Sequence, residues 1–408
     1  MWRTSESGRQ RRFKFMSIST DAKSSPGGGV SARVDHTNNF DLIRLLAASQ
    51  VLLVHIPNTL SLTIKPAVFA FLLGQFPGVS VFFVVSGFLV TQSYRYGSGG
   101  AVSYFGRRAL RIYPALWVNI GLIVLLLAAT GSLSSEIRGP KLLEWLLVTF
   151  FMGSEIAGNF FVGIITAADG LYRQFPSGVT WTLVVEIGFY ILLPFIILGR
   201  SSDKRRLLAS LVVWMIISLL VSHYYFHLKD VSPEGGLTKL LSINTFTYLW
   251  TFLIGVTCAI YWDRLHVFFE GYFLPWLAVY LCAAVFVHFY FHVDDFGHYT
   301  STAGMEFMTL LMAGVVMSFA FTWRNAAAIL RGNDLSYGIY LYHRPIIVSL
   351  GLLGFAGMWI GWPLVLGATI ALAGLSWFLL EQRALRLKTH LDRWSGATLR
   401  TMRLSADA

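Results

Sequence analysis

Ten long apolar runs constrain the fold of this chain more than any other feature of its sequence. Each is about 18 to 22 residues long, which is the length that a helix needs to cross the hydrocarbon core of a bilayer. The runs lie at residues 41–58, 77–95, 112–130, 180–199, 206–226, 240–261, 272–292, 304–323, 335–353 and 359–380. Of the 408 residues, 55% are hydrophobic and 13% are charged, whereas soluble domains contain about 25% charged residues. The predicted fold class is therefore an all-α polytopic membrane protein.

Basic residues predict which loops face the cytoplasm, because Lys and Arg favour that side of a membrane. They gather at 94–111, 199–206 and 383–394, whereas 292–298 and 354–358 contain none. This alternation predicts a multi-pass protein of the inner (plasma) membrane with both termini in the cytoplasm.

The apolar segment at 142–153 is shorter than a membrane crossing requires. If it did cross, every later loop would change sides and the basic loop at 199–206 would face outside. We therefore predict a re-entrant or interfacial helix at 142–153, in addition to ten crossings.

Composition divides the chain into three parts. Residues 1–39 are polar, basic and rich in Ser and Gly without a signal-peptide core, and they predict a disordered cytoplasmic tail. Residues 40–388 form the membrane domain, and 389–408 form a cytoplasmic C-terminal tail. The basic residues behind the net charge of +11 gather in tails and loops, so we expect membrane lipids and no nucleic acid as partners. Cys258 and Cys282 both lie in apolar runs and indicate neither a disulfide nor a metal site.

The first run carries two ionisable residues, Arg44 and His55. Such side chains cost free energy at bilayer depth and usually face an interior cavity. Their spacing places them within about 20° on one helix face and about 16 Å apart along its axis. This geometry suits a long ligand with an anionic head and a reactive tail, in a passage open to both faces of the membrane. Alternatively, Arg44 extends to the interface and His55 makes a buried hydrogen bond. Asp41 is expected to cap this helix or to pair with Arg44.

Glu186 is expected at the same depth as His55. His55 lies about 21 Å from the cytoplasmic start of its helix, and Glu186 lies about 9 Å into a helix that enters from outside. A carboxylate beside a histidine orients the ring and stabilises its protonated form. Together the two would act as a general base on a hydroxyl group. In the alternative interpretation, each side chain is satisfied by its own neighbours.

Three further features mark the membrane domain. Ser86 and Gly87 interrupt an apolar run, and small residues allow close approach of a ligand or of another helix. Arg108 and Arg111 lie one helical turn apart at a cytoplasmic end, where they would bind phosphate groups or only set the topology. His343 lies about 12 Å into a tyrosine-rich helix, either in a polar cavity wall or in the core.

These segments resemble, in the same order, the motifs of the acyltransferase-3 family of integral membrane O-acyltransferases. Arg44 and His55 match its Arg-x10-His pattern, GVSVFFVVSGFL resembles FFxxSGF, and RRALRIYPALW is similar to its Arg-x-x-Arg stretch. VTWTLVVEIGFYILLP resembles the motif Trp-Ser-Leu-x-x-Glu-x-x-Phe-Tyr. NDLSYGIYLYHRP resembles the late Ser-Tyr-x-x-Tyr-Leu-x-His motif, and WFLLEQRALR resembles the closing segment of the family. The resemblance covers about residues 40–388. The chain departs from it at Ile187, where many members have a second glutamate, and at Thr182, where serine is common.

The resemblance implies ten membrane helices and transfer of an acyl group, usually acetyl, from cytoplasmic acyl-CoA. The acceptor would be a hydroxyl of an extracytoplasmic glycan, such as an exopolysaccharide or O-antigen, or of a lipid-linked saccharide. No metal is expected. Direct transfer is preferred over an acyl-histidine intermediate. We expect His55 and Glu186 to be catalytic. Donor binding is expected of Arg44, Arg108, Arg111 and Ser86, and Ser86 is also expected beside the oxyanion. Acceptor binding is expected of His343 and Tyr337.

A transporter or flippase for a lipid-linked saccharide is the alternative function, because polar residues within the membrane would fit transport too. The arginine cluster aligned with a deep histidine favours the enzyme, since transport does not require that combination.

Overall fold

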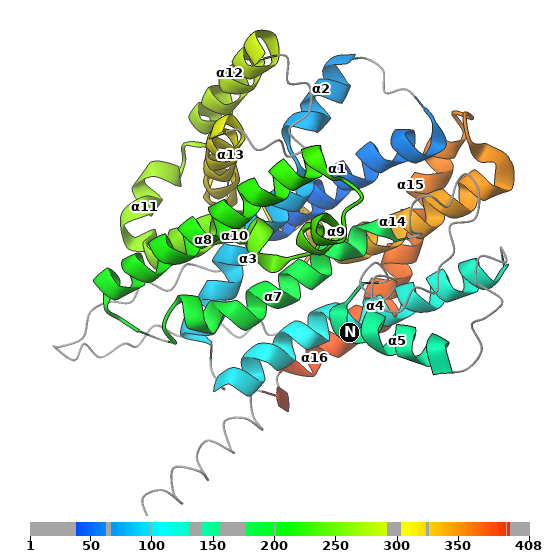
Figure 1. Cartoon of the computed structure of the whole chain (residues 1–408), viewed down its shortest axis with the longest axis horizontal. Coiled ribbons are helices and arrows are strands. Elements are labelled where there is room, and N and C mark those ends of the chain that lie inside the picture. The colour runs from blue at the N-terminus through cyan, green and yellow to red at the C-terminus, as the bar shows by residue number, and fades with distance from the viewer. Residues whose placement is uncertain are drawn as a thin grey trace, which may run out of the picture. The chain divides into compact units, whose positions relative to one another are not determined.

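The computed structural model describes residues 38–62, 67–97, 100–129, 140–154, 177–199, 201–291, 303–323, 326–388 and 390–391. All of them belong to one compact unit, residues 35–408 (Figure 1). The predicted tails at 1–39 and 389–408, and the acid-bearing loop at 292–298, fall almost entirely outside the described residues.

The described part of the chain is helical and contains ten helices that are long and apolar enough to cross a membrane, which confirms the predicted fold class. The α-helices are α1 (Phe40–Leu60), α2 (Ala67–Gln75), α3 (Gly78–Tyr96), α4 (Gly100–Ala129), α5 (Pro140–Met152), α7 (Trp181–Ile196), α8 (Lys204–Val231), α9 (Gly236–Ser242), α10 (Thr245–Ile260), α11 (Trp262–Phe269), α12 (Phe273–Phe291), α13 (Ala303–Phe321), α14 (Ser336–Leu350), α15 (Gly361–Ser376) and α16 (Gln382–Arg386). Three spans combine two or more of these elements: α2 with α3, α9 with α10, and α15 with α16.

Two helix boundaries bear on the site. Helix α4 begins at Gly100 rather than near residue 112, so Arg108 and Arg111 lie on the helix itself. Helix α5 has 13 residues and is not among the ten candidate spans, as its short apolar segment predicts. Helix α4 extends beyond its apolar run because basic residues at a membrane edge can continue a helix. Helix α5 is too short to cross, because about a dozen apolar residues do not span the hydrocarbon core of a bilayer.

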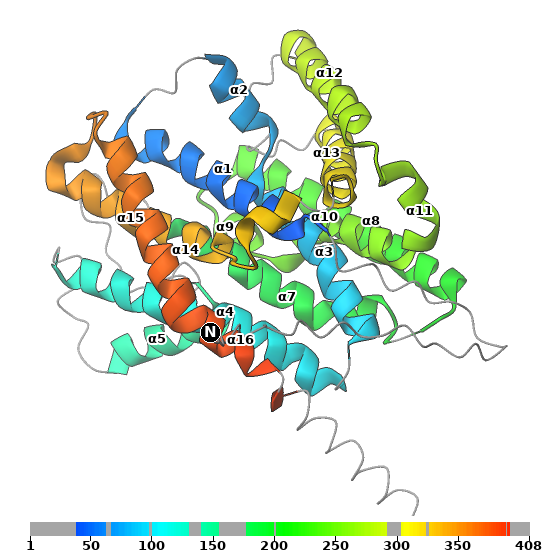
Figure 2. The ribbon, with the colours of Figure 1, turned by 180° about the vertical axis from the view of Figure 1, so that it is seen from behind.

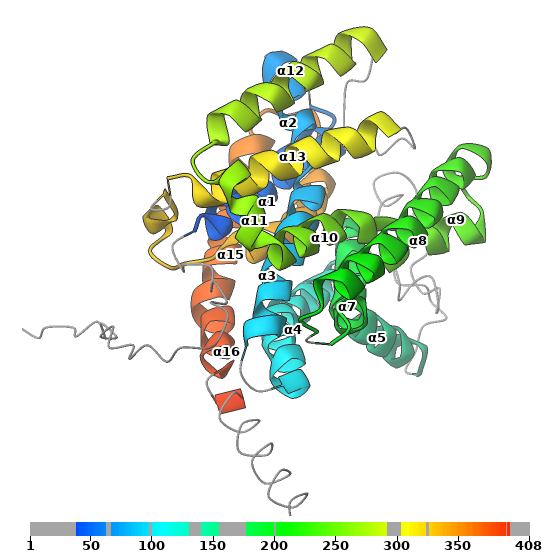
Figure 3. The same ribbon diagram turned by 90° about the vertical axis from the view of Figure 1, so that its left-hand side faces the viewer.

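Helices α3 and α10 cross in the centre of the bundle (Figures 2 and 3). The span that contains α10, Gly236–Ile260, is the most buried of the ten. Glycines make this close crossing possible. A Cβ atom at Gly87 would lie 2.1 Å from the carbonyl oxygen of Phe252, and one at Gly255 would lie 2.0 Å from that of Val84. Neither residue can therefore carry a side chain, which confirms the packing interpretation of the Ser86–Gly87 pair for Gly87.

The start of α1 is attached to the end of α13 by one buried side chain. The amide nitrogen of Asn39 donates to the carbonyl oxygens of Phe319 and Thr322 at 3.0 and 2.7 Å, and its amide oxygen accepts from the backbone of Ala327 at 3.0 Å. These bonds satisfy carbonyl groups that the end of a helix leaves without a partner. They also hold the segment that carries Arg44 in place.

Candidate active site

A cavity of about 350 Å³ lies between α1, α3, α4, α7 and the start of α14. We call it the arginine cavity. Its lining includes five basic side chains and three acidic ones. They are Arg44, Arg107, Arg108, Arg111 and Lys388, with Asp41, Glu186 and Asp334. The three arginines that the sequence analysis selected therefore come together, from two helices far apart in the chain.

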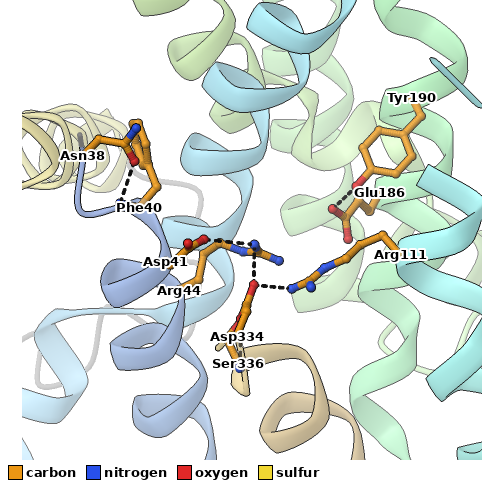
Figure 4. Close-up of polar contacts among 9 residues, drawn as sticks. All are labelled: Asn38, Phe40, Asp41, Arg44, Arg111, Glu186, Tyr190, Asp334 and Ser336. Carbon is orange, nitrogen blue, oxygen red and sulfur yellow. Dashed lines mark hydrogen bonds and ion pairs between the residues drawn. The ribbon is translucent and has the colours of Figure 1, made fainter. Parts of the chain in front are cut away.

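Asp334 joins two of these arginines (Figure 4). Its Oδ2 atom accepts from Arg44 at 2.8 Å and from Arg111 at 2.6 Å, and its Oδ1 accepts from the backbone and hydroxyl of Ser336. Burial opposes ionisation, yet Arg111 and Arg44, helped by Ser336, hold the pKa of the Asp334 carboxyl well below its usual range. Asp41 also lies 3.8 Å from Arg44, which confirms the predicted pair.

No role was predicted for Asp334 from the sequence. The available signal was its place two residues before Ser336, where an aspartate caps the first turn of a helix. That signal predicts a cap and not an ion pair with residues more than 200 positions away.

Arg108 and Lys388 lack such a carboxylate. The Arg108 guanidinium lies 5.6 Å from the ring centres of both Tyr104 and Tyr190, and its Nε and Nη2 atoms are buried without a hydrogen-bond acceptor. Burial, and then repulsion from Arg111 and Arg108, lowers the pKa of Lys388 to about 8. Lys388 forms no ion pair with a described residue. These two cations therefore remain available to an anionic ligand.

Glu186 lies in the arginine cavity and not beside His55. Its Oε1 atom accepts from the hydroxyl of Ser86 at 3.3 Å and from that of Tyr190 (Figure 4). The expected contact between Glu186 and His55 is absent, because α7 directs the carboxylate toward α3 rather than α1. The Ser86 hydroxyl lines the arginine cavity and donates to Glu186, and its expected role beside an oxyanion stays a prediction.

His55 lines a second cavity of about 310 Å³, which we call the histidine cavity. Its lining combines polar groups with aromatic rings and one lysine. They include Gln50, Asn58, Trp181, Tyr225, Lys229 and Tyr248. Arg44 and His55 therefore face two different cavities, and the predicted single passage is divided.

His55 contacts His343 of α14. The Nδ1 atom of His55 lies 2.9 Å from the carbonyl oxygen of Val51 and 3.1 Å from Nε2 of His343, whose own Nδ1 lies 3.0 Å from the carbonyl oxygen of Ile339. A carbonyl oxygen only accepts hydrogen bonds, so each Nδ1 carries the proton of its neutral ring. His343 then accepts at Nε2, and the Nε2 atom of His55 retains a free lone pair. This is the arrangement of a general base.

Neither His343 nor Tyr337 lines the histidine cavity, and their expected part in acceptor binding stays a prediction. His343 is completely buried, contacts His55 and lines neither cavity. Tyr337 lines the arginine cavity and donates to the carbonyl oxygen of Ile112 at 2.9 Å. The neighbouring Arg344 donates to Thr59 at 2.6 Å and joins α14 to α1 beside the two imidazoles.

The described ranges contain ten helices long and apolar enough to cross a membrane, and some of them line a basic cavity and a separate histidine cavity. These features define a multi-pass membrane protein with two adjoining internal sites. Residues 37–380 match the acyltransferase domain family, and the chain belongs to it. It is thus a membrane acyltransferase, as its motifs predicted.

Individual relatives agree with the family. "Nodulation protein 10" of Rhizobium leguminosarum bv. viciae is 37% identical over 361 residues, which cover 87% of this chain and 95% of that protein. "Putative peptidoglycan O-acetyltransferase YrhL" of Bacillus subtilis (strain 168) is 27% identical over 339 residues, 76% of this chain and 50% of that protein. A "Putative O-acetyltransferase" of Staphylococcus aureus (strain COL) is 25% identical over 304 residues, 68% of this chain and 46% of that protein. The chain thus spans about half the length of the last two. No solved structure matches it.

Proposed function

We propose that this protein transfers an acyl group, usually acetyl, from acyl-CoA to a hydroxyl group of a saccharide. The observation that carries the proposal is the pairing of a cavity rich in uncompensated positive charge with an adjoining cavity that holds a histidine base. An acyl-CoA has several anionic phosphates at one end and a reactive thioester at the other. Such a donor requires cations at one end of its site and chemistry at the other.

The arginine cavity would hold the donor. Arg108 and Lys388 have no carboxylate partner among the described residues, and they would bind phosphate groups directly. Arg44 and Arg111 are already bound to Asp334, so they would contribute mainly by fixing the shape and charge of the wall. This division refines the expectation that Arg44, Arg108 and Arg111 act alike.

The histidine cavity would hold the acceptor. Polar groups among aromatic rings are typical of small-ligand sites, and Asn58, Trp181 and Tyr248 provide both. By the distribution of basic loops, this cavity faces outside and the arginine cavity faces the cytoplasm. Names of relatives include a peptidoglycan O-acetyltransferase, which supports a glycan acceptor.

The proposed reaction is direct transfer. The Nε2 atom of His55 removes the proton from the acceptor hydroxyl, and the oxygen of that hydroxyl attacks the carbonyl carbon of the thioester. The tetrahedral intermediate collapses, the carbon–sulfur bond breaks, and the thiolate of CoA leaves and takes up the proton. His343 holds the His55 ring in the tautomer that this step requires. Glu186 keeps Ser86 and Tyr190 in place on the donor side.

A deletion strain complemented with the wild type or with His55→Ala tests the proposal. Mass spectrometry of its surface glycans and lipid-linked saccharides should find acetyl groups with the wild type and none with His55→Ala, at equal amounts of membrane-inserted protein. Acetylation restored by His55→Ala would contradict the mechanism. Titration of the purified protein with acetyl-CoA separates the enzyme from a saccharide transporter, because transport predicts no binding.

A further inference from the structure

The two cavities share a wall made of two residues. Among the residues that the structure describes, only Val79 and Tyr340 line both the arginine cavity and the histidine cavity. Val79 also packs against both of the buried apolar clusters that surround the cavities. A ligand group that passes from one cavity to the other must therefore pass these two side chains.

Hydrogen bonds hold Tyr340 in the closed position. Its hydroxyl donates to the carbonyl oxygen of Val179 at 3.0 Å and lies 2.7 Å from the hydroxyl of Thr182. The ring of Phe82 packs edge-on against the Tyr340 ring, with centroids 5.4 Å apart. Only 5% of Tyr340 is exposed, so its ring cannot turn without breaking these contacts.

Tyr340 also lies between the donor side and the base. It precedes His343 by one turn of α14, and the two rings lie 6.2 Å apart. His343 in turn contacts His55. A displacement of Tyr340 would therefore open the passage directly beside the group that removes the proton.

We propose that Tyr340, backed by Val79, is a barrier that separates the donor from the acceptor cavity and protects the acyl donor from water. The need for it rests on the proposed function, since a thioester reacts with any activated hydroxyl, water included. In the unwanted reaction, the oxygen of water bonds to the acyl carbon, the carbon–sulfur bond breaks, and a proton passes to the CoA thiolate. The products are a carboxylic acid and free CoA.

Cysteine accessibility tests the barrier without reference to activity. In a Cys258→Ala/Cys282→Ala background, Asn58→Cys reports access to the histidine cavity and Ser86→Cys reports access to the arginine cavity. A charged, membrane-impermeant methanethiosulfonate is added from the side that modifies Asn58→Cys. Ser86→Cys should be protected when Tyr340 is present. It should be modified at least tenfold faster with Tyr340→Ala, and at an intermediate rate with Tyr340→Phe, which keeps the ring but loses both hydrogen bonds.

Tyr342→Phe is the matched control. Tyr342 lies on the same helix, is fully buried and also makes two hydrogen bonds, to the carbonyl of Ala115 and to Ser376, but it lines neither cavity. Its loss should leave Ser86→Cys protected. Rapid modification of Ser86→Cys with Tyr340 intact, or no change with Tyr340→Ala and Tyr340→Phe, would overturn the barrier. If the Tyr340→Ala protein does not insert into the membrane, Asn58→Cys will no longer be modified. In that case the result with Tyr340→Phe alone tests the barrier.

Release of free CoA from acetyl-CoA, measured without an acceptor, tests the consequence. Tyr340→Ala should raise this hydrolysis at least threefold over the wild type, whereas Tyr342→Phe should not. If cysteine accessibility shows the barrier but no variant binds acetyl-CoA, the proposed function is disproved while the barrier proposal stands. The two failures are therefore distinguishable.

Discussion

The Nδ1 atom of His55 lies 3.1 Å from Nε2 of His343, although the two residues are 288 positions apart in the chain. Because the carbonyl oxygens of Val51 and Ile339 each require a donor, the contact has a defined direction, from His55 to His343. One neutral imidazole thus orients another. A carboxylate, the usual orienting group, is not needed to fix the tautomer of the base.

This relationship predicts the effect of changing His343. His343→Ala should reduce kcat for acetyl transfer by about 10- to 100-fold, with little change in the KM for acetyl-CoA, because a group that orients a catalytic side chain contributes about this much. His343→Gln should recover much of the loss, since its amide oxygen can accept the same hydrogen bond. Steady-state kinetics of the three proteins checks this. Equal activity of His343→Ala and wild type would show that His55 needs no such partner.

Asp334 should contribute far more to stability than a surface carboxylate. Asp334→Ala leaves the partly buried Arg44 and Arg111 without their shared counter-ion, although Arg44 keeps Asp41, and breaking a buried pair costs about 3–5 kcal/mol. Asp263→Asn is the control, because its pair with Lys204 is 2.6 Å long but about half exposed, and exposed pairs contribute at most about 1 kcal/mol. Chemical denaturation of both variants in detergent compares the two losses. Similar losses would contradict the role given to Asp334.

Arg108→Ala and Lys388→Ala should each weaken the binding of acetyl-CoA by about tenfold or more, since a hydrogen bond to a charged group is worth about 1.5–3 kcal/mol. Arg206→Ala should have no effect, because Arg206 is exposed and pairs with Asp203 outside the cavity. Calorimetric titration measures all three. Equal affinity for acetyl-CoA in every variant would show that Arg108 and Lys388 do not bind the donor.

The pKa of Lys388 also predicts a pH dependence. Burial and neighbouring arginines lower this pKa to about 8. The ammonium is therefore charged at pH 7 and largely neutral at pH 9. Affinity for acetyl-CoA should fall as the pH rises through 8, and Lys388→Arg should remove that fall because arginine stays protonated. The same pH titration of both proteins tests the assignment.

Close packing at the α3–α10 crossing makes a separate prediction. Gly255→Ala should destabilise the protein or prevent insertion, because the new Cβ would lie 2.0 Å from the carbonyl oxygen of Val84. Gly367→Ala is the matched control in α15, where nothing lies within 4 Å. It should be neutral or stabilising by up to about 1 kcal/mol, as expected for alanine in place of glycine within a helix. Thermal unfolding in detergent compares them.

The sequence by itself determined the ten spans and the short α5 helix, and its resemblance to the family grouped Arg44 with Arg108 and Arg111. The spans and α5 depend on a local property, namely the length of an apolar run.

Only the tertiary structure decided which side chains meet. The rise per residue places His55 and Glu186 at a height, but the rotation of α1, α7 and α14 about their own axes determines what each faces. That rotation is set by packing, such as the close approach of Gly188 in α7 to Thr245 and of Gly338 in α14 to Ala373, and no single segment encodes it. For this reason His343 rather than Glu186 contacts His55, Asp334 joins two arginines, and Tyr340 divides the expected passage into two cavities.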